Sequence, residues 1–458
     1  MTAGRLVLPA ESCVPELARR IAAAGGRIVV VGGWVRDALR GHASHDLDLE
    51  VFGMAEDAID PLLVGLSFST RVGRQFPVWR QVRDGIDLAY PRSGADVDHP
   101  DRPESLEAAF RAAARHRDLR VNAIGWDPLA DSLIDPWEGL ADLRAGQLRA
   151  VAPDTFTADP LRLLRVARLA AVLEARPDEE LCALCRGLDF GTVAVERVAG
   201  ELARMLLDPE RPSRAFALLA ELGRLDVFPP VERLVAVPQD PAWHPEGDVF
   251  VHTLMVLDRA REIVREVDDE SALILMLAAL CHDLGKPETT TFEGTRVRSL
   301  AHAEASARRA REWLARLRFP DRVVRTVGVL VAYHLAPSQL VRQESGPRAY
   351  RRLARRLAVD GASLWLLEKL ARADQLGRTT EEALSGHYDA GAAFLAAADA
   401  AEVREAPRAD VVSAQALMQR GIAPGPELGR RLRRCREIED ETGWHDPERI
   451  LERCLADR

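Results

Sequence analysis

Patterns that mark membrane and secreted proteins are missing from this chain of 458 residues. No stretch reaches about 18 consecutive apolar residues, and the most apolar one, residues 271–281, is too short to span a membrane. The N-terminus opens Met-Thr-Ala-Gly-Arg and has no long apolar signal core. The sequence therefore predicts a cytoplasmic protein without a membrane partner.

Cysteine is also sparse, with six residues scattered over the chain. Only Cys182 and Cys185 form a C-x-x-C pair, inside the apolar run LCALC, and a zinc site would need a second ligand pair nearby. We therefore predict packed helical thiols rather than a zinc centre. No disulfide framework is indicated, which fits a reducing compartment.

Lysine occurs only at Lys286 and Lys369, so almost all basic residues are arginines. Genomic base composition is enough to explain this bias, so we give little weight to a preference for bidentate phosphate contacts. The net charge of −9 argues weakly against a nucleic-acid partner, but a local basic patch is what binds phosphate. The composition is that of a globular protein, and the length predicts about two to four domains.

The region up to residue 103 has mixed α/β patterning. An apolar β-branched run leads into a glycine pair and a helix, and an alternation of acidic and apolar residues then predicts a half-buried strand. The expected elements are strand 27–31, turn 32–33, helix 34–39, strand 46–51, a hairpin of strands 78–82 and 85–89, and a mobile Gly-, Pro- and Asp-rich loop 90–103.

From Asp159 onward, apolar residues recur at helical spacing, and Pro160 falls at the expected first helical position, where its missing N–H costs little. Helical patterns cover 159–173, 196–223, 251–265, 271–281, 302–317, 321–334, 347–357, 363–373 and the alanine-rich 390–402. We therefore divide the chain into a head (1–150), a helical neck (151–230), a helical domain rich in His and Asp (231–385) and a helical tail (386–458).

Three aspartates predict a metal site for phosphate chemistry. Asp46 and Asp48 lie two apart on the expected strand, so their side chains point to the same face. Asp87, on another expected strand, is the natural third carboxylate. Such a face can hold a pair of Mg²⁺ ions, which clamp the attacking and leaving oxygens of an in-line displacement at phosphorus.

Gly32 and Gly33 let backbone N–H groups approach a triphosphate at the start of the expected helix, with Arg36 as a further contact. Each feature alone has an ordinary explanation, because a glycine pair is usually a tight turn and a D-x-D is commonly a solvated face. Both occur within 17 residues in the order strand, turn, helix, strand. This combination favours a nucleotidyl-transfer site.

These segments resemble motif A of the class II tRNA nucleotidyltransferase and bacterial poly(A) polymerase family, which belongs to the polymerase-beta-type superfamily. The resemblance implies an α+β fold, in which a nucleotidyltransferase head with a small mixed sheet precedes all-helical domains. The matching segments are GGWVRD (32–37), DLD (46–48), RDLRVNA (117–123), DPLRLLRVAR (159–168) and ERVAGE (196–201).

The resemblance also implies residue roles. Asp46 and Asp48 would bind Mg²⁺. Asp159 and Arg162, neighbours on the expected helix, would hydrogen-bond the base edge of CTP or ATP as an amino-acid template. Without the other motifs, the arginines of this helix would be interpreted as a solvated, salt-bridged face. The implied nucleotide contacts are Gly32, Gly33, Arg36, Arg117, Asp118, Asn122, Asp159, Arg162, Arg165 and Arg168.

Three positions depart from the family pattern. Ala158 stands where the family usually has Glu, His116 replaces the first Arg of an R-R-D motif, and His45 replaces the usual basic residue before the D-x-D. The Asp159–Arg162 pair is retained. We therefore expect nucleotide selection, and we expect these three departures to affect its fidelity.

A second set of ligands lies in the helical region. His252, His282-Asp283 and Asp374 follow the order H…HD…D, and LCHDLGK (280–286) resembles the HD phosphohydrolase family. A lone His-Asp pair is usually structural, but four ligands in order can close a divalent site that suits Ni²⁺, Co²⁺, Mn²⁺ or Mg²⁺. His302 and His334 stand where some members carry extra histidines, which leaves room for a second metal. WHPEGD (243–248) resembles nucleotidyltransferases that carry this domain.

Together the resemblances imply an enzyme that adds C, C and A to the tRNA 3′ end from CTP and ATP. Its HD domain would repair RNA ends as a 2′,3′-cyclic phosphodiesterase or phosphatase. No obligate protein partner is implied. Two alternatives stay open: a CC-adding, A-adding or poly(A)-adding enzyme of the same family, and a metal phosphohydrolase whose head only senses nucleotides.

Overall fold

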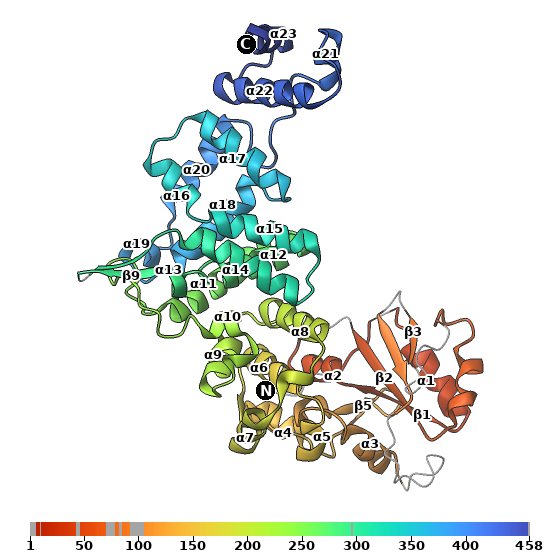
Figure 1. Cartoon of the computed structure of the whole chain (residues 1–458). Helices are drawn as coiled ribbons and strands as arrows, with labels where there is room; N and C mark the ends of the chain where they lie inside the picture. Colours follow the sequence, from red (N-terminus) through yellow and green to blue (C-terminus); the bar gives the residue numbers. More distant parts are fainter. Residues whose placement is uncertain are drawn as a thin grey trace. The chain divides into compact units, whose positions relative to one another are not determined.

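The computed structural model describes residues 6–9, 11–42, 46–69, 78–81, 85–91, 105–294 and 296–456. The chain divides into two compact units, Met1–Val193 and Ala194–Arg458 (Figure 1). Within the described residues, no helix has both the length and the apolar character that crossing a membrane requires. The fold is α+β, as the sequence predicted, with a mixed sheet in the first unit and mainly helices in the second.

The first unit is built on a six-stranded sheet with the strand order β3-β4-β2-β1-β5-β6. Among the described strands of this sheet, β2 and β4 are parallel, and the other neighbouring pairs are antiparallel. The strands are β1 (Arg27–Val31), β2 (Leu47–Phe52), β3 (Val78–Gln81), β4 (Ile86–Ala89), β5 (Gly125–Asp127) and β6 (Ser132–Ile134). The expected strands and hairpin are confirmed, whereas β5 and β6 were not predicted.

Strand β1 sends alternate side chains into two cores. Ile28 and Val30 join the core formed with α1 (Val14–Ala23) and α2 (Gly33–Leu39), while Val29 and Val31 pack with Phe110 of α3 (Leu106–Ala114) on the other face. Burial on both faces explains why the sequence of β1 is continuously apolar. In β2, apolar and acidic residues alternate instead, so the acidic side chains point to the face of the sheet opposite the first core.

The helix after the sheet begins later than the sequence predicted. Helix α6 is Arg162–Leu173, so Asp159 and Pro160 precede it. Asp159 Oδ1 accepts the Leu161 N–H at 3.3 Å, a side-chain bond that competes with helix formation. The remaining α-helices and strands described in this unit are α4 (Gly139–Ala145), β7 (Gln147–Leu148), α5 (Pro153–Thr157), β8 (Arg176–Pro177) and α7 (Glu179–Gly187).

The second unit is organised around α12 (Asp269–Cys281), in which every residue from Ile274 to Cys281 is buried. A helix that is apolar on all sides needs neighbours all round, and α12 contacts α8, α11, α14, α15 and α18. The other main helices are α8 (Val195–Leu207), α9 (Ser213–Glu221), α10 (Pro229–Glu232), α11 (Val249–Ile263), α13 (Lys286–Thr289), α14 (His302–Arg316), α15 (Asp321–Tyr333), α16 (Ala336–Arg342), α17 (Pro347–Val359), α18 (Leu364–Leu376), α19 (Glu381–Leu384) and α20 (Asp389–Ala400).

Two features of the second unit differ from the expected helices. The pattern over 196–223 is interrupted between α8 and α9, where Pro212 precedes the second helix. A hairpin of β9 (Thr290–Glu293) and β10 (Arg296–Ser299) follows α13, in a segment with β-branched residues that periodicity did not resolve. The tail helices α21 (Ala414–Gln419), α22 (Pro426–Thr442) and α23 (Pro447–Ala456) share a small core of their own.

Candidate functional site

The sheet register brings the acidic residues of the head together. Asp48 of β2 is paired directly with Asp87 of β4, and Val31 and Arg80 extend the same cross-strand row. Residues opposite one another in neighbouring strands share a face, so the two carboxylates lie side by side. Asp46 is exposed one residue before β2.

Arg80 holds Asp87 in a way that the sequence did not predict. Its Nε donates to Asp87 Oδ1 at 2.8 Å and its Nη2 donates to Oδ2 at 2.7 Å. A bidentate pair of this kind occupies both carboxylate oxygens. A cation bound at Asp87 therefore competes with the Arg80 guanidinium.

Asp48 lies in a cavity of about 320 Å³ whose lining includes Asp87, Glu50 and Arg117. The pKa of the Asp48 carboxyl is raised, mainly because neighbouring atoms exclude water from it. This holds although part of the residue is exposed at the surface. The negative charges of Asp87, Glu50 and Asp46 raise this pKa further, and the nearby Arg117 opposes them. A divalent cation would relieve this accumulation of negative charge, so the acidic centre fits one.

The glycine turn and the segment RDLRVNA (117–123), which resembles motif B of the family, reach the same point. Gly32 has φ +79°, and a Cβ there would lie 3.2 Å from Asp48 Oδ2 and 3.3 Å from Arg117 Nη1. Only glycine adopts this conformation easily, and only glycine leaves space for these neighbours. Arg117 also donates to Glu50 Oε1 at 2.6 Å. The structure thus brings together Gly32, Asp48, Asp87 and Arg117, with Gly33 as the first residue of α2.

Several expected nucleotide contacts instead form a buried network. Asp118 accepts from Arg165 Nε at 2.7 Å, from Asn122 Nδ2 at 2.9 Å and from the Leu119 N–H at 2.8 Å. Burial alone would raise the pKa of Asp118, but the ion pair with Arg165 and these hydrogen bonds outweigh it and lower the pKa to about 2. Arg36 Nη1 donates to Asn122 Oδ1 at 2.6 Å. This network ties α2 and motif B to α6.

The arginines of α6 form a salt-bridged but only partly solvated face, so that alternative interpretation holds only in part. Arg168 is only 4% exposed, and Arg165 pairs with the buried Asp118. Arg162 donates to the backbone oxygens of Thr155 and His116, each at 2.6 Å. His45 and most of the expected loop 90–103 lie outside the described residues.

In four histidines of the second unit, the ring atom Nδ1 makes a hydrogen bond with an oxygen. Each Nδ1 is bonded to an oxygen: His252 to Glu246 Oε1 (2.8 Å), His282 to Ala279 O (2.8 Å), His302 to Ser299 O (2.7 Å) and His334 to Val331 O (2.7 Å). This arrangement orients the ring and leaves Nε2 as the ligand atom, as is usual for histidines that bind metals. The histidines belong to α11, α14 and the C-terminal ends of α12 and α15.

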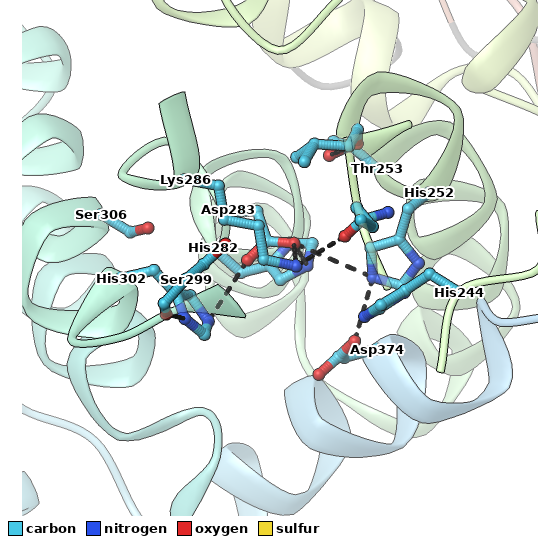
Figure 2. Close-up of polar contacts among 12 residues, drawn as sticks. His244, His252, Thr253, His282, Asp283, Lys286, Ser299, His302, Ser306 and Asp374 are labelled. Atoms are coloured by element: carbon cyan, nitrogen blue, oxygen red, sulfur yellow. Dashed lines mark hydrogen bonds and ion pairs between the residues drawn. The ribbon is translucent and has the colours of Figure 1, made fainter. Parts of the chain in front are cut away.

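The Nε2 atoms converge on two aspartates. His252 Nε2 lies 3.1 Å from Asp374 Oδ1, and His282 Nε2 lies 3.1 Å from Asp283 Oδ2. Asp283 Oδ1 lies 3.5 Å from His302 Nε2. Figure 2 shows Asp283 between His302 and His252, with Asp374 reaching towards His252 from α18.

This histidine cluster has the unsatisfied atoms that a cation would fill. His282 Nε2 and both carboxylate oxygens of Asp283 are buried and make no hydrogen bond of regular geometry within the described residues. Asp283 Oδ2 is reached instead by ion-pair contacts, the shortest of them from Lys286 Nζ at 2.8 Å and from His282 Nε2 at 3.1 Å. Such atoms are costly to bury without a partner. Two metal-compatible groups share Asp283, one with His252 and His282 and the other with His302 and His334. Mixed nitrogen and oxygen donors fit one or two divalent ions.

Charge and burial keep His334 and Asp283 in their metal-binding forms. Burial, followed by the neighbouring His302 and His282, lowers the pKa of His334 to about 3. Burial would raise the pKa of Asp283, but His282 and Lys286 hold it well below its usual range. Near neutral pH, His334 is therefore neutral and Asp283 ionised, as metal binding requires.

Sequence reasoning missed the residues that support this cluster. Glu246 Oε1 accepts from His252 Nδ1 at 2.8 Å and from His244 Nδ1 at 2.9 Å, and Glu246 Oε2 accepts the Thr379 N–H at 3.1 Å. Lys286 Nζ lies 2.8 Å from Asp283 Oδ2. The segment WHPEGD before the first ligand was the available signal, but it did not reveal these contacts.

The fold and the two centres are those of a nucleotidyltransferase joined to an HD-type hydrolase domain. Residues 28–149 match the poly(A) polymerase head domain family, and residues 249–360 match the HD domain family. The multifunctional CCA protein of Halorhodospira halophila is 33% identical over 431 residues, which cover 89% of this chain and 95% of that protein. The multifunctional CCA protein of an Acidovorax species is 37% identical over 308 residues, covering 64% of this chain and 69% of the other. The chain belongs to the multifunctional CCA protein family of nucleotidyltransferases.

Solved structures agree on the fold. The CCA-adding enzyme of Bacillus stearothermophilus in complex with CTP has a TM-score of 0.66 and 17% identity, and the similarity covers 98% of each chain. The CCA-adding enzyme of Thermotoga maritima complexed with tRNA has a TM-score of 0.58 and 17% identity, with coverage of 99% of this chain and 96% of that one.

Proposed function

We propose that this chain adds C, C and A to the 3′ end of tRNA from CTP and ATP. The observation that carries the proposal is the convergence of Gly32, Asp48, Asp87 and Arg117 on one face of the head. Similarity to multifunctional CCA proteins over most of the chain supports the same reaction. The family is metal-dependent, and we propose Mg²⁺ for the acidic centre because its carboxylate ligands suit that ion.

Mg²⁺ bound there would neutralise charge on the attacking and leaving oxygens. The 3′ hydroxyl oxygen of tRNA forms a bond to the α-phosphorus, and the bond to pyrophosphate breaks. Asp46, Asp48 and Asp87 hold the cation in this proposal. Arg117 and the Gly32-Gly33 turn approach the triphosphate from the same side.

Base selection is assigned to the start of α6 and the turn that precedes it. Asp159 and Arg162 carry the donor and acceptor groups that distinguish CTP and ATP from the other nucleotides. The network around Asp118 positions α6, and with it Arg162, relative to motif B. Arg162→Ala is expected to relax the choice among the four NTPs, and an unchanged preference would remove this role.

For the second unit we propose hydrolysis of 2′,3′-cyclic phosphates and phosphate monoesters at RNA ends. His252, His282, Asp283 and Asp374 hold one divalent ion, and His302 and His334 provide for a second. Ni²⁺, Co²⁺, Mn²⁺ and Mg²⁺ are the proposed ions, and a bound ion would lower the pKa of a water molecule. Water oxygen adds to phosphorus as one ester bond breaks, and the released ribose oxygen takes a proton.

We further propose that the chain works as four parts: a head (1–150), a neck (151–230), an HD domain (231–385) and a tail (386–458). The helical parts would contact tRNA through backbone shape rather than base sequence. Because its substrate is tRNA, we propose a cytoplasmic location and no obligate protein partner.

One assay tests the nucleotidyl transfer. The protein is incubated with tRNA that lacks its 3′ CCA, with Mg²⁺ and with each labelled NTP in turn, and Asp48→Asn serves as the inactive control. Addition of C, C and then A is the expected result. Addition of A alone, of CC alone or of a long A tail would instead indicate another activity of the same family. No incorporation, with cyclic phosphodiesterase activity intact, would make the head a sensor.

A further inference from the structure

The histidine cluster opens into a cavity of about 750 Å³. His334 and Asp374 line it next to the cluster, and Trp243, Arg342, Arg378 and Tyr388 line other parts of its wall. This volume is in the range of pockets that hold small organic ligands. The cavity is therefore larger than a phosphate group alone requires.

Trp243 is the unusual side chain of this wall. It is 64% exposed, and it is the one tryptophan among the large hydrophobic side chains that are exposed in the described part of the chain. Its backbone is fixed, because its N–H donates to Asp240 O at 3.0 Å and the next residue, His244, is bonded to Glu246. An indole held open to water beside a polar cavity is typical of a surface for stacking a flat ligand.

Two arginines line the same cavity as the tryptophan and the cluster ligands. Arg378 Nη2 lies 3.4 Å from Asp374 Oδ2, a long contact for an ion pair. Arg378 Nε is buried and has no hydrogen-bond partner within the described ranges. Its guanidinium thus has donor capacity left for an anionic group, and Arg342 adds a second cation to the wall.

We propose that Trp243 is a stacking platform for the terminal nucleobase of the substrate, whose phosphate Arg378 holds beside the cluster. The inference rests on the proposed hydrolase function and adds the residues that recognise the base and the phosphate of its substrate. Stacking accepts every base, because each has a π-face. The HD domain therefore acts on RNA 3′ ends whatever their last nucleotide is.

Two substrates that differ only in the base test this platform. Adenosine 2′,3′-cyclic phosphate is compared with 1-O-methylribose 2′,3′-cyclic phosphate, which has no base. Trp243→Ala is expected to raise KM for the adenosine substrate about tenfold and to leave KM for the base-free substrate unchanged. Trp243→Phe should restore most of the difference, since its ring also stacks.

The matched control is Phe292→Ala, because Phe292 is 68% exposed but lies in β9 and does not line the cavity. This variant should leave both KM values unchanged. The metal content per chain should be the same in Trp243→Ala and the native protein, which shows that the cluster is intact. An equal rise in KM for both substrates, or no rise for either, would overturn the proposal.

Equilibrium binding separates this inference from the hydrolase function. Adenosine 2′-monophosphate and 1-O-methylribose 2-phosphate are titrated calorimetrically into the native protein and into Trp243→Ala. Selective weakening of adenosine 2′-monophosphate binding supports the platform even where the native protein hydrolyses neither cyclic substrate. Equal binding of adenosine 2′-monophosphate to both proteins overturns it even where hydrolysis is observed.

Discussion

In the first unit, the aspartates lie on an open face of the sheet, and Arg80 holds one of them. In the second unit, by contrast, most ligands are buried and each histidine is fixed through its Nδ1. The acidic centre is thus incomplete until a cation and the nucleotide arrive. The histidine cluster is already oriented by the protein itself. The difference matches the two tasks, because the head must accept different nucleotides in turn, while a hydrolase needs a rigid water-binding centre.

Removing one ligand from each centre is the strongest test of their independence. Asp48→Asn should lower CMP incorporation at least about a hundredfold, because it removes a carboxylate that holds the cation. His282→Ala should lower cyclic phosphodiesterase activity by a similar factor. Each variant is assayed for both activities, and its Tm is measured as a folding control. If either substitution abolished both activities without lowering Tm, the two centres would not be independent.

The fixed orientation of the histidine cluster predicts a large effect away from the ligands. Glu246→Gln should weaken metal binding about 10- to 100-fold, because it removes the charged acceptor for His252 Nδ1. Mn²⁺ is titrated into metal-free protein in an Asp48→Asn background, so that the head contributes little heat. Glu293→Gln, which changes an exposed glutamate of β9, is the control. Equal affinity in both variants would contradict the orienting role of Glu246.

The buried network of the head predicts a pH-dependent stability. The pKa of Asp118 is lowered to about 2, so its contribution is fully present above its unfolded pKa of about 3.9 and is lost as pH falls towards 2. Asp118→Asn should therefore cost on the order of 2 kcal/mol at neutral pH. Denaturant unfolding between pH 7 and pH 3 measures the difference, which should shrink below about pH 4. A difference that is constant over this range would mean that Asp118 acts through packing alone.

The smallest expected effect concerns Arg80. Arg80→Ala frees Asp87, so the Mg²⁺ concentration for half-maximal CMP incorporation should fall about two- to fivefold, the size expected for an exposed ion pair. Arg19→Ala, which removes an exposed arginine of α1, is the matched control. A higher Mg²⁺ requirement in Arg80→Ala would show that Arg80 positions Asp87 instead of competing for it.

Local periodicity was sufficient for most elements near the sites. The acidic–apolar alternation of β2 predicted the strand that carries Asp48, and the apolar run of α12 predicted the helix that ends at Cys281, directly before His282. The start of α6 was predicted wrongly, because a turn bonded by the Asp159 side chain precedes the helix and periodicity cannot detect it. Hairpin β9–β10 was missed because both strands are short and mainly exposed.

By itself, the sequence determined which candidate residues stand together locally, since the glycine turn, the D-x-D segment and the His-Asp pair are each contiguous and their spacing follows the local backbone. The tertiary structure alone decided that Asp87 lies beside Asp48 and pairs with Arg80, that the Nε2 atoms of three histidines lie near Asp283 or Asp374, and that Glu246 supports His252. These contacts join residues that are often far apart in the chain. They depend on strand register and on helices packed around α12, which no local pattern encodes.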